Sequence, residues 1–147
     1  MSEYIHKSHN VTILLYHLVF PAKYRRAVID EKVDACLKEM CLEIAKRCEI
    51  SFLEIGTDKD HVHFLVQSVP SDSVPKLVRV IKSVTAREIF RSCPQVKKQL
   101  WGGGFWSGGY FASTAGKRGA EAVIAKYVKG QGGEYRLLHR GEQVELF

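Results

Sequence analysis

Residues 51–69, SFLEIGTDKDHVHFLVQSV, decide the fold that we predict for this chain. Ser51–Ile55 and His61–Val69 are rich in β-branched and aromatic residues, which is typical of β-strands. Between them, Gly56–Asp60 reads GTDKD and has the composition of a turn. We therefore expect the two strands to pair as a hairpin.

A segment with helical spacing flanks this hairpin on each side. Before it, apolar residues between about Asp30 and Cys48 recur every three or four positions, which predicts an amphipathic helix. After it, Ser71-Asp72-Ser73 offers an N-cap, and Pro75 stands early in a second apolar-striped segment. Cys93-Pro94 should end that second helix because proline disfavours a helical residue before it.

Two further strands are expected outside the helices. Val11–Phe20 is rich in β-branched and aromatic residues and is followed by Pro21, while Tyr110–Thr114 follows a glycine-rich aromatic loop. The resulting order β-α-β-β-α-β predicts an α+β, ferredoxin-like fold, an antiparallel sheet with helices on one face. A C-terminal helix is predicted from about Arg118 to Lys129, and residues 134–147 show no clear pattern.

The composition is that of one globular domain, which we expect to span residues 1–147. The chain is 46% hydrophobic and 26% charged, so extensive disorder is not expected. Twenty-two Lys and Arg residues against 16 Asp and Glu residues give a net charge of +6, which suits a polyanionic partner. Met1–Asn10 lacks the apolar core of a signal peptide, and the longest apolar run, Val11–Phe20, is too short to span a bilayer. A cytoplasmic protein without a membrane segment is expected.

The four cysteines are expected to be buried free thiols. Their spacings match no zinc-ligand pattern, and three of them fall among apolar neighbours in the first predicted helix. They are Cys36, Cys41, Cys48 and Cys93.

Four residues suggest chemistry. His61 and His63 flank Val62 in a predicted strand, where side chains alternate, so both imidazoles point to one face and can hold one metal ion. Tyr127 and Gln131 are four residues apart near the end of the last predicted helix, which places a phenol and an amide on one helix face. Taken singly, these features also fit a half-exposed strand, a core tyrosine and a solvated helix end.

Their combination suggests cleavage of a phosphodiester. Imidazoles suit transition metals, whereas amide and phosphate oxygens suit Mg²⁺ or Mn²⁺, and such an ion polarises a phosphate. A tyrosine phenol with its free pKa near ~10 needs activation by a metal or a base. Its attack on phosphorus leaves a 5′-phosphotyrosine and a free 3′-hydroxyl. Rejoining then needs no ATP or other nucleotide cofactor.

Several motifs recur in order along nearly the whole chain. They are Tyr16-His17-Leu18-Val19-Phe20 with Lys23-Tyr24-Arg25-Arg26, Asp60-His61-Val62-His63-Phe64-Leu65-Val66, Leu100-Trp101, Phe105-Trp106-Ser107-Gly108-Gly109-Tyr110-Phe111, and Tyr127-Val128-Lys129-Gly130-Gln131. Together they resemble the HUH superfamily of single-tyrosine transposases, the type encoded by the smallest bacterial insertion sequences. One small departure is Phe20-Pro21-Ala22-Lys23, where the family more often has proline directly before lysine.

The resemblance implies a role for each candidate residue. His61, His63 and Gln131 would bind the metal, Mg²⁺ or Mn²⁺, and Tyr127 would be the nucleophile. The family works as a homodimer in which the tyrosine helix of one subunit can complete the metal site of the other. It recognises folded single-stranded DNA hairpins near the ends of the element.

The sequence offers aromatic and basic residues that could contact DNA. Trp101, Phe105 and Trp106 can stack on unpaired bases, although core packing or a dimer contact is expected for at least two of them. Plausible phosphate contacts are Lys23, Arg25, Arg26, Lys76, Arg79, Lys82 and Arg87.

Two alternative functions stay open. One is a domesticated HUH nickase acting on repeated palindromes. Another is a non-catalytic RNA- or single-strand-binding module, which leaves the four candidate residues unexplained.

Overall fold

The computed structural model describes residues 6–7, 10–11, 14–101, 103–115 and 135–141. A short hairpin pairs the first two strands, and a 3-10 turn, η1, covers Lys23–Arg25. The strands are β1 (His6–Lys7), β2 (Asn10–Val11), β3 (Leu14–Pro21), β4 (Ser51–Thr57), β5 (His61–Ser68), β6 (Phe111–Ala115) and β7 (Arg136–Arg140). The helices are α1 (Glu31–Arg47), α2 (Val74–Ser92) and α3 (Pro94–Gln99).

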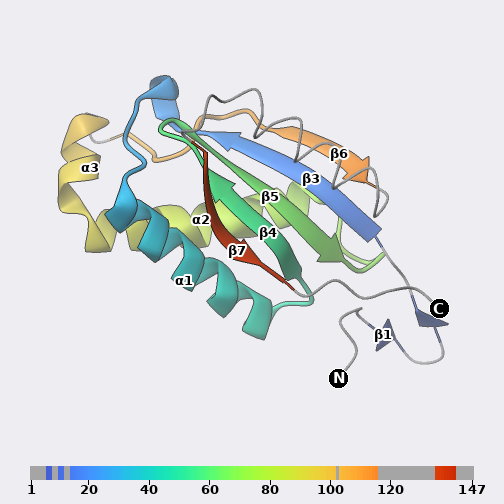
Figure 1. Ribbon diagram of the computed structural model, residues 1–147. Helices are drawn as coiled ribbons and strands as arrows, with labels where there is room; N and C mark the ends of the chain where they lie inside the picture. The colour runs from blue at the N-terminus through green and yellow to red at the C-terminus, as the bar shows by residue number, and fades with distance from the viewer. Residues whose placement is uncertain (1–5, 8–9, 12–13, 102, 116–134, 142–147) are drawn as a thin grey trace.

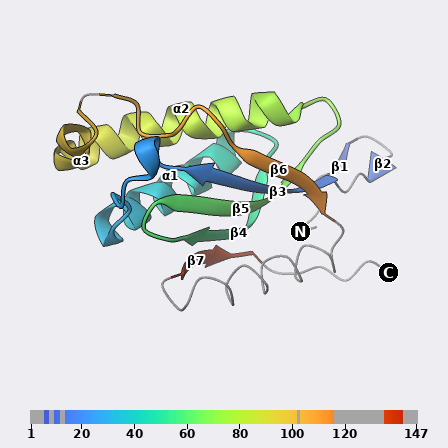
Figure 2. The same ribbon diagram turned by 90° about the horizontal axis from the view of Figure 1, so that it is seen from above.

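Five strands form one antiparallel sheet in the order β6-β3-β5-β4-β7, which can be followed in Figures 1 and 2. The units β3-α1-β4 and β5-α2-β6 each enclose one antiparallel strand between their two strands, which is the ferredoxin-like arrangement. The predicted α+β fold is therefore confirmed. The sheet has one strand more than predicted, because β7 pairs with β4 at the edge.

The structure corrects one detail of the prediction and adds two others, while α2 ends before Cys93-Pro94 as predicted. The segment Gly56–Asp60 is not all turn, because β4 continues through Thr57, and Gly56 pairs with His63. The tail residues 136–140, which show no sequence pattern, form β7. Pro94 is also the first residue of a further short helix, α3. A proline is tolerated there because the N–H that it lacks has no partner within the helix at the first position.

The hydrophobic core lies between the two long helices and one face of the sheet. Leu37 of α1 and Ile81 of α2 pack in one cluster with Phe20, Val62 and Phe64 of the sheet, all of them fully buried. Capping side chains begin both helices. The side chain of Asp30 accepts a hydrogen bond from the Val33 N–H at 3.0 Å, and that of Ser73 accepts one from the Lys76 N–H at 3.2 Å.

The cysteines divide differently from the expectation. Three are buried free thiols, whereas Cys48 is exposed because it follows the last turn of α1 at the surface. Among the described residues, no helix is long and apolar enough to cross a membrane.

Candidate active site

The histidine pair lies on the face of the sheet opposite to the one on which α1 and α2 pack. Val62 and Phe64 of β5 point into the helix-covered core, so the alternating His61 and His63 point to the opposite face, as predicted. Both histidines are buried, with exposed fractions of 7% and 0%. Every residue of β5 is buried, so this strand is covered on both faces.

A hydrogen bond to Asp60, which is itself held by Arg25, orients His61. Its Nδ1 lies 2.6 Å from Asp60 Oδ1, and Arg25 Nε donates to Asp60 Oδ2 at 3.3 Å. Burial acts to raise the pKa of Asp60, but the hydrogen bond from His61 and the charge of Arg25 hold it below its ordinary value. An ionised carboxylate at Nδ1 favours the tautomer with its lone pair on Nε2, the form in which an imidazole can bind a metal ion.

His63 sits deeper, between two other rings. The ring centres of His17 and Tyr135 lie 4.8 Å and 5.0 Å from that of His63. Burial lowers the pKa of His63 to about 3, helped by the neighbouring His17 and His61. The imidazole is therefore neutral near pH 7, which is the state that a metal ligand requires.

Gly56 makes room for the aromatic side chain that covers His63. It pairs with His63 in the sheet, and a Cβ at this position would overlap the hydroxyl of Tyr135. Burial raises the pKa of Tyr135, and the nearby Glu54 adds to this effect, so its phenol is harder to ionise than usual. Tyr135 is thus a packing residue beside His63 and a poor candidate for an activated nucleophile.

His17 is a buried histidine that the sequence did not single out as a site residue. It is 3% exposed, and its ring packs between those of His63 and Phe111, the latter at 5.9 Å. Within the described part of the chain, neither ring nitrogen of His17 has a hydrogen-bonding partner. Burial lowers its pKa, so this ring is also neutral. Only the strand register, not the spacing in sequence, brings it beside His63.

The other two candidate residues, Tyr127 and Gln131, lie outside the described residues. The described chain leaves the sheet at Ala115, at the β6 edge, and re-enters at Arg136, at the β7 edge. Strand β5 lies midway between these two edges. Among the described residues, no three His, Cys, Asp or Glu side chains converge as a metal-binding group.

A polar cluster anchors the chain where it returns to the sheet. Arg136 Nε donates to Asp34 Oδ2 at 2.6 Å, and its Nη2 donates to the Ile29 carbonyl at 2.9 Å. Thr57 Oγ1 donates to Asp34 Oδ1 at 2.7 Å. The carboxylate of Asp34 is buried, so these bonds compensate the loss of its hydration. They tie β7 to α1 and β4.

The three aromatic residues of the glycine-rich segment, Trp101, Phe105 and Trp106, differ in burial. Phe105 and Trp106 are buried in the core, which confirms the expectation for two of the three, and Trp106 Nε1 donates to Thr85 Oγ1 at 3.0 Å. Trp101 is 72% exposed. Among the predicted phosphate contacts, Lys82 turns inward, since its Nζ donates to the carbonyls of Ser107 and Gly109.

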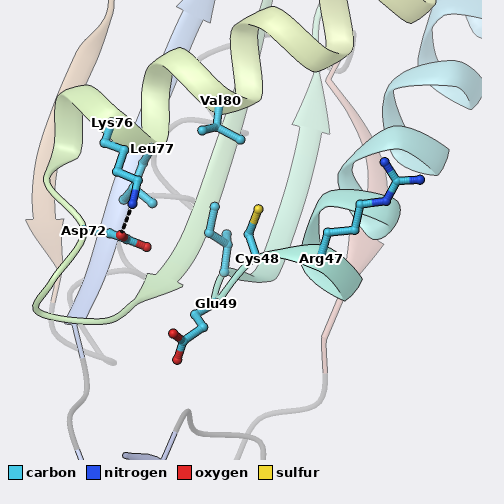
Figure 3. A pocket seen from close by; sticks show the side chains of 8 residues that line it. Arg47, Cys48, Glu49, Asp72, Lys76, Leu77 and Val80 are labelled. Carbon is cyan, nitrogen blue, oxygen red and sulfur yellow. Dashed lines mark hydrogen bonds and ion pairs between the residues drawn. The ribbon is translucent and has the colours of Figure 1, made fainter.

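A separate pocket of about 240 Å³ lies between the end of α1 and the start of α2 (Figure 3). An ion pair between Lys76 Nζ and Asp72 Oδ1, 2.7 Å long, lies at one side of it. Its other lining residues include Ile50, which precedes β4 at the end of the hairpin remote from His61. This pocket is therefore not part of the histidine site.

Comparisons with known proteins place the chain in a family. The model of the family described as "Transposase IS200 like" matches residues 10–131. The ISDra2 transposase TnpA of Deinococcus radiodurans is 34% identical over 118 residues, which cover 80% of this chain and 84% of that protein. The transposase of insertion sequence element IS200 from Salmonella typhimurium is 30% identical over 135 residues, 89% of this chain and 83% of that protein.

Two solved structures resemble this chain. A crystal structure of a proposed transposase from Deinococcus radiodurans R1 superposes with a TM-score of 0.70 and 29% identity, covering 86% of this chain and 97% of that one. A REP-associated tyrosine transposase bound to a REP hairpin has a TM-score of 0.59 with 12% identity, over 90% of this chain and 76% of that one, so it shares the fold. The match over residues 10–131 and the relatives at 30% identity or more show that this chain belongs to the IS200-like transposase family and is a transposase.

Proposed function

We propose that this transposase cuts and rejoins single-stranded DNA at the ends of an insertion sequence, with Tyr127 as the nucleophile. The observation that carries the proposal is the buried pair His61 and His63 on one sheet face, with Asp60 holding the ring of His61. The family match extends to residue 131, so it includes Tyr127 and Gln131. The named relatives at 30% and 34% identity are transposases of insertion sequences, which favours a mobile element over a domesticated nickase.

His61 and His63 would hold a divalent ion, Mg²⁺ or Mn²⁺, together with the side-chain oxygen of Gln131. The two buried imidazoles fit this role, because one is oriented by a carboxylate and the other is kept neutral by burial. An amide oxygen and a phosphate oxygen would give the mixed nitrogen and oxygen set that such ions accept. When bound, the ion would supply positive charge that polarises the scissile phosphate.

The phenol oxygen of Tyr127 would form the new bond to phosphorus, while the bond from phosphorus to the 3′-oxygen of the preceding nucleotide breaks. The phenol loses its proton, and the departing 3′-oxygen gains one to become a 3′-hydroxyl. The downstream strand stays attached as a 5′-phosphotyrosine. Attack by a 3′-hydroxyl of another strand end then reforms a DNA phosphodiester and releases the tyrosine, so no nucleotide cofactor is needed.

The substrate would be a single strand folded into hairpins near the element's ends. The net charge of +6 suits a polyanion. The exposed side chains of Arg26, Arg79 and Arg87 remain available for phosphate contacts. We infer that the protein acts as a homodimer in which Tyr127 and Gln131 of one subunit complete the His61–His63 site of the other.

A test for covalent adducts addresses the nucleophile. The protein is incubated with labelled single-stranded hairpin DNA from the flanks of its gene, with and without Mg²⁺, and resolved on a denaturing gel. We expect a protein–DNA band that needs the metal and is absent in Tyr127→Phe. Binding without any adduct, across several metals and flanks, would rule out the enzyme mechanism.

Tyr135→Phe is the matched control, because this substitution also removes one hydroxyl from a tyrosine, here the one whose ring packs on His63. We expect this variant to form the adduct. If instead Tyr135→Phe abolishes the band and Tyr127→Phe retains it, the nucleophile has been assigned to the wrong residue.

A mixing experiment tests the shared site. A His61→Ala/His63→Ala subunit and a Tyr127→Phe subunit are each inactive alone, but a mixed dimer restores one intact site if the parts come from different subunits. We expect cleavage to return after mixing. No return of cleavage, with subunit exchange verified by mass spectrometry, would show that each site is built within one subunit.

A further inference from the structure

Three non-glycine residues adopt left-handed backbone conformations, and they gather at one surface. Tyr24 and Arg25 have φ of 60° and 52° in the turn after β3, and Trp101 has φ of 53° just after α3. Such conformations are unfavourable for residues with a side chain and cluster at functional sites. Here they hold two large rings in solvent, since Tyr24 is 58% and Trp101 72% exposed.

Contacts join the two segments into one surface, which we name the stacking platform and define as Tyr24, Arg26 and Trp101. The rings of Tyr24 and Trp101 are 5.8 Å apart, and the guanidinium of Arg26 lies 4.3 Å from the centre of the Trp101 ring. The backbone N–H of Lys23 donates to the Phe105 carbonyl at 2.8 Å, which fixes the turn on the loop. The platform is thus a built surface rather than two isolated side chains.

Its chemistry fits an unpaired base with its phosphates. Proteins hold single strands by stacking bases on exposed aromatic rings and placing cations along the backbone. Arg26 lies over the Trp101 ring, yet Trp101 is still 72% exposed, which leaves surface on which a base can stack. Exposed lysines, Lys97 and Lys98, lie in the last turn of α3 directly before the tryptophan.

Hydrogen bonds connect this surface to the candidate active site. The Ala22 N–H, at the start of the turn, donates to the Asp60 carbonyl at 2.8 Å. Arg25, within the turn, donates to the Asp60 carboxylate, which in turn bonds His61. The turn that carries Tyr24 and Arg26 is therefore hydrogen-bonded to Asp60, the residue that orients a candidate metal ligand.

We propose that Trp101 and Tyr24 bind an unpaired base of the single-stranded DNA beside the phosphate to be cut, with Arg26 supporting the tryptophan ring. This inference rests on the proposed DNA transposase function and locates a part of the substrate that must be single-stranded. Bases that are paired in a duplex cannot enter, because their faces are already stacked.

The first experiment compares two DNA probes in a Tyr127→Phe background, which prevents cleavage. Both carry the same hairpin; one has a single-stranded flank of thymidines, and the other has a flank of abasic units that keeps every phosphate. Measured by fluorescence anisotropy, the thymidine flank should bind roughly ten- to a hundredfold more tightly. Trp101→Ala should remove this preference, whereas Trp101→Phe, which retains a ring, should keep most of it.

The second experiment uses intrinsic fluorescence. The chain has two tryptophans, and Trp106 is buried, so Trp101 reports on the surface. Stacking of a base should quench tryptophan emission with the thymidine flank but not with the abasic flank, and Trp101→Phe should abolish the response. Arg47→Ala is the charge control, because Arg47 is an exposed cation on α1; it should leave the preference for bases unchanged.

The possible outcomes distinguish a failure of the stacking-platform proposal from a failure of the proposed DNA transposase function. If the protein binds the hairpin but does not distinguish the two flanks, or if Trp101→Ala keeps the preference, the platform is wrong and the transposase proposal stands. If it binds neither probe, DNA binding itself fails. If Trp101→Ala loses self-association while keeping the preference for bases, the platform is a protein contact and the inference is overturned.

Discussion

The two faces of β5 are equally buried but differ in chemistry. Val62 and Phe64 point to α1 and α2 and belong to the apolar core, where burying such a side chain contributes about 1.5–3 kcal/mol. On the other face, His61, His63 and Gln67 are polar and also buried, and Leu65 between them packs with Leu15 in a small separate cluster. Burial of the imidazole of His63 lowers its pKa to about 3, so this face carries a desolvation penalty. One face contributes apolar burial to the fold, and the other holds the imidazole of His63 buried and neutral.

The largest effect on stability is expected on the helix-covered face. Phe64→Ala should lower the free energy of unfolding by about 3–5 kcal/mol, because it opens a cavity in the core. His63→Ala should lower the free energy of unfolding by less than about 2 kcal/mol. This substitution also opens a cavity, but it relieves the cost of burying a polar imidazole. Urea unfolding of the two variants measures the difference. Equal losses would show that the histidine face contributes to stability as much as the core does.

A smaller effect on stability is expected at β7, the edge strand that comes after Tyr127 and Gln131 in the sequence. Arg136→Leu leaves the buried Asp34 carboxylate with fewer donors and should destabilise the protein by about 2–3 kcal/mol. Arg47→Leu removes an exposed ion pair with Glu43 and should change stability by less than about 0.5 kcal/mol. Thermal melts compare them, and similar shifts would mean that β7 is not anchored by this cluster.

Asp60 supports the histidine face of β5 and can be changed to Asn at nearly constant volume. Asp60→Asn weakens the acceptor at His61 Nδ1, so Mn²⁺ affinity, measured by titration calorimetry, should fall about 10- to 100-fold. Circular dichroism should show an unchanged fold. Asp72→Asn removes a carboxylate that pairs with Lys76, remote from His61, and serves as the control. Equal affinities in all three proteins would remove Asp60 from the support of the metal site.

The smallest effect separates strain from function at Trp101. Because φ is 53° there, Trp101→Gly should be about 1 kcal/mol more stable than Trp101→Ala, although both lack the ring. Both variants should lose the preference for a base-bearing flank. A glycine variant that is less stable than the alanine variant would contradict the left-handed conformation as a source of strain.

Much of the fold follows from periodicity, but the parts that surround the histidines do not. The three- and four-residue spacing predicted α1 and α2, and Asp30 and Ser73 do cap them. Strand β7 gave no signal, because it is held by pairing with β4 and by Arg136 rather than by an alternating pattern of its own. Thr57 seemed to belong to a turn, yet it extends β4 because Asp34 and the β5 partner both engage it.

By itself, the sequence determined which side chains share a face of β5, because alternation along a strand is a property of the backbone. It also indicated the order of elements and the candidate set His61, His63, Tyr127 and Gln131. Only the tertiary structure decided what lies beside those histidines. His17 and Tyr135 reach His63 through strand register across the sheet, and Tyr24 meets Trp101 across 77 positions of chain. Such contacts depend on how distant segments pack, and local spacing carries no information about them.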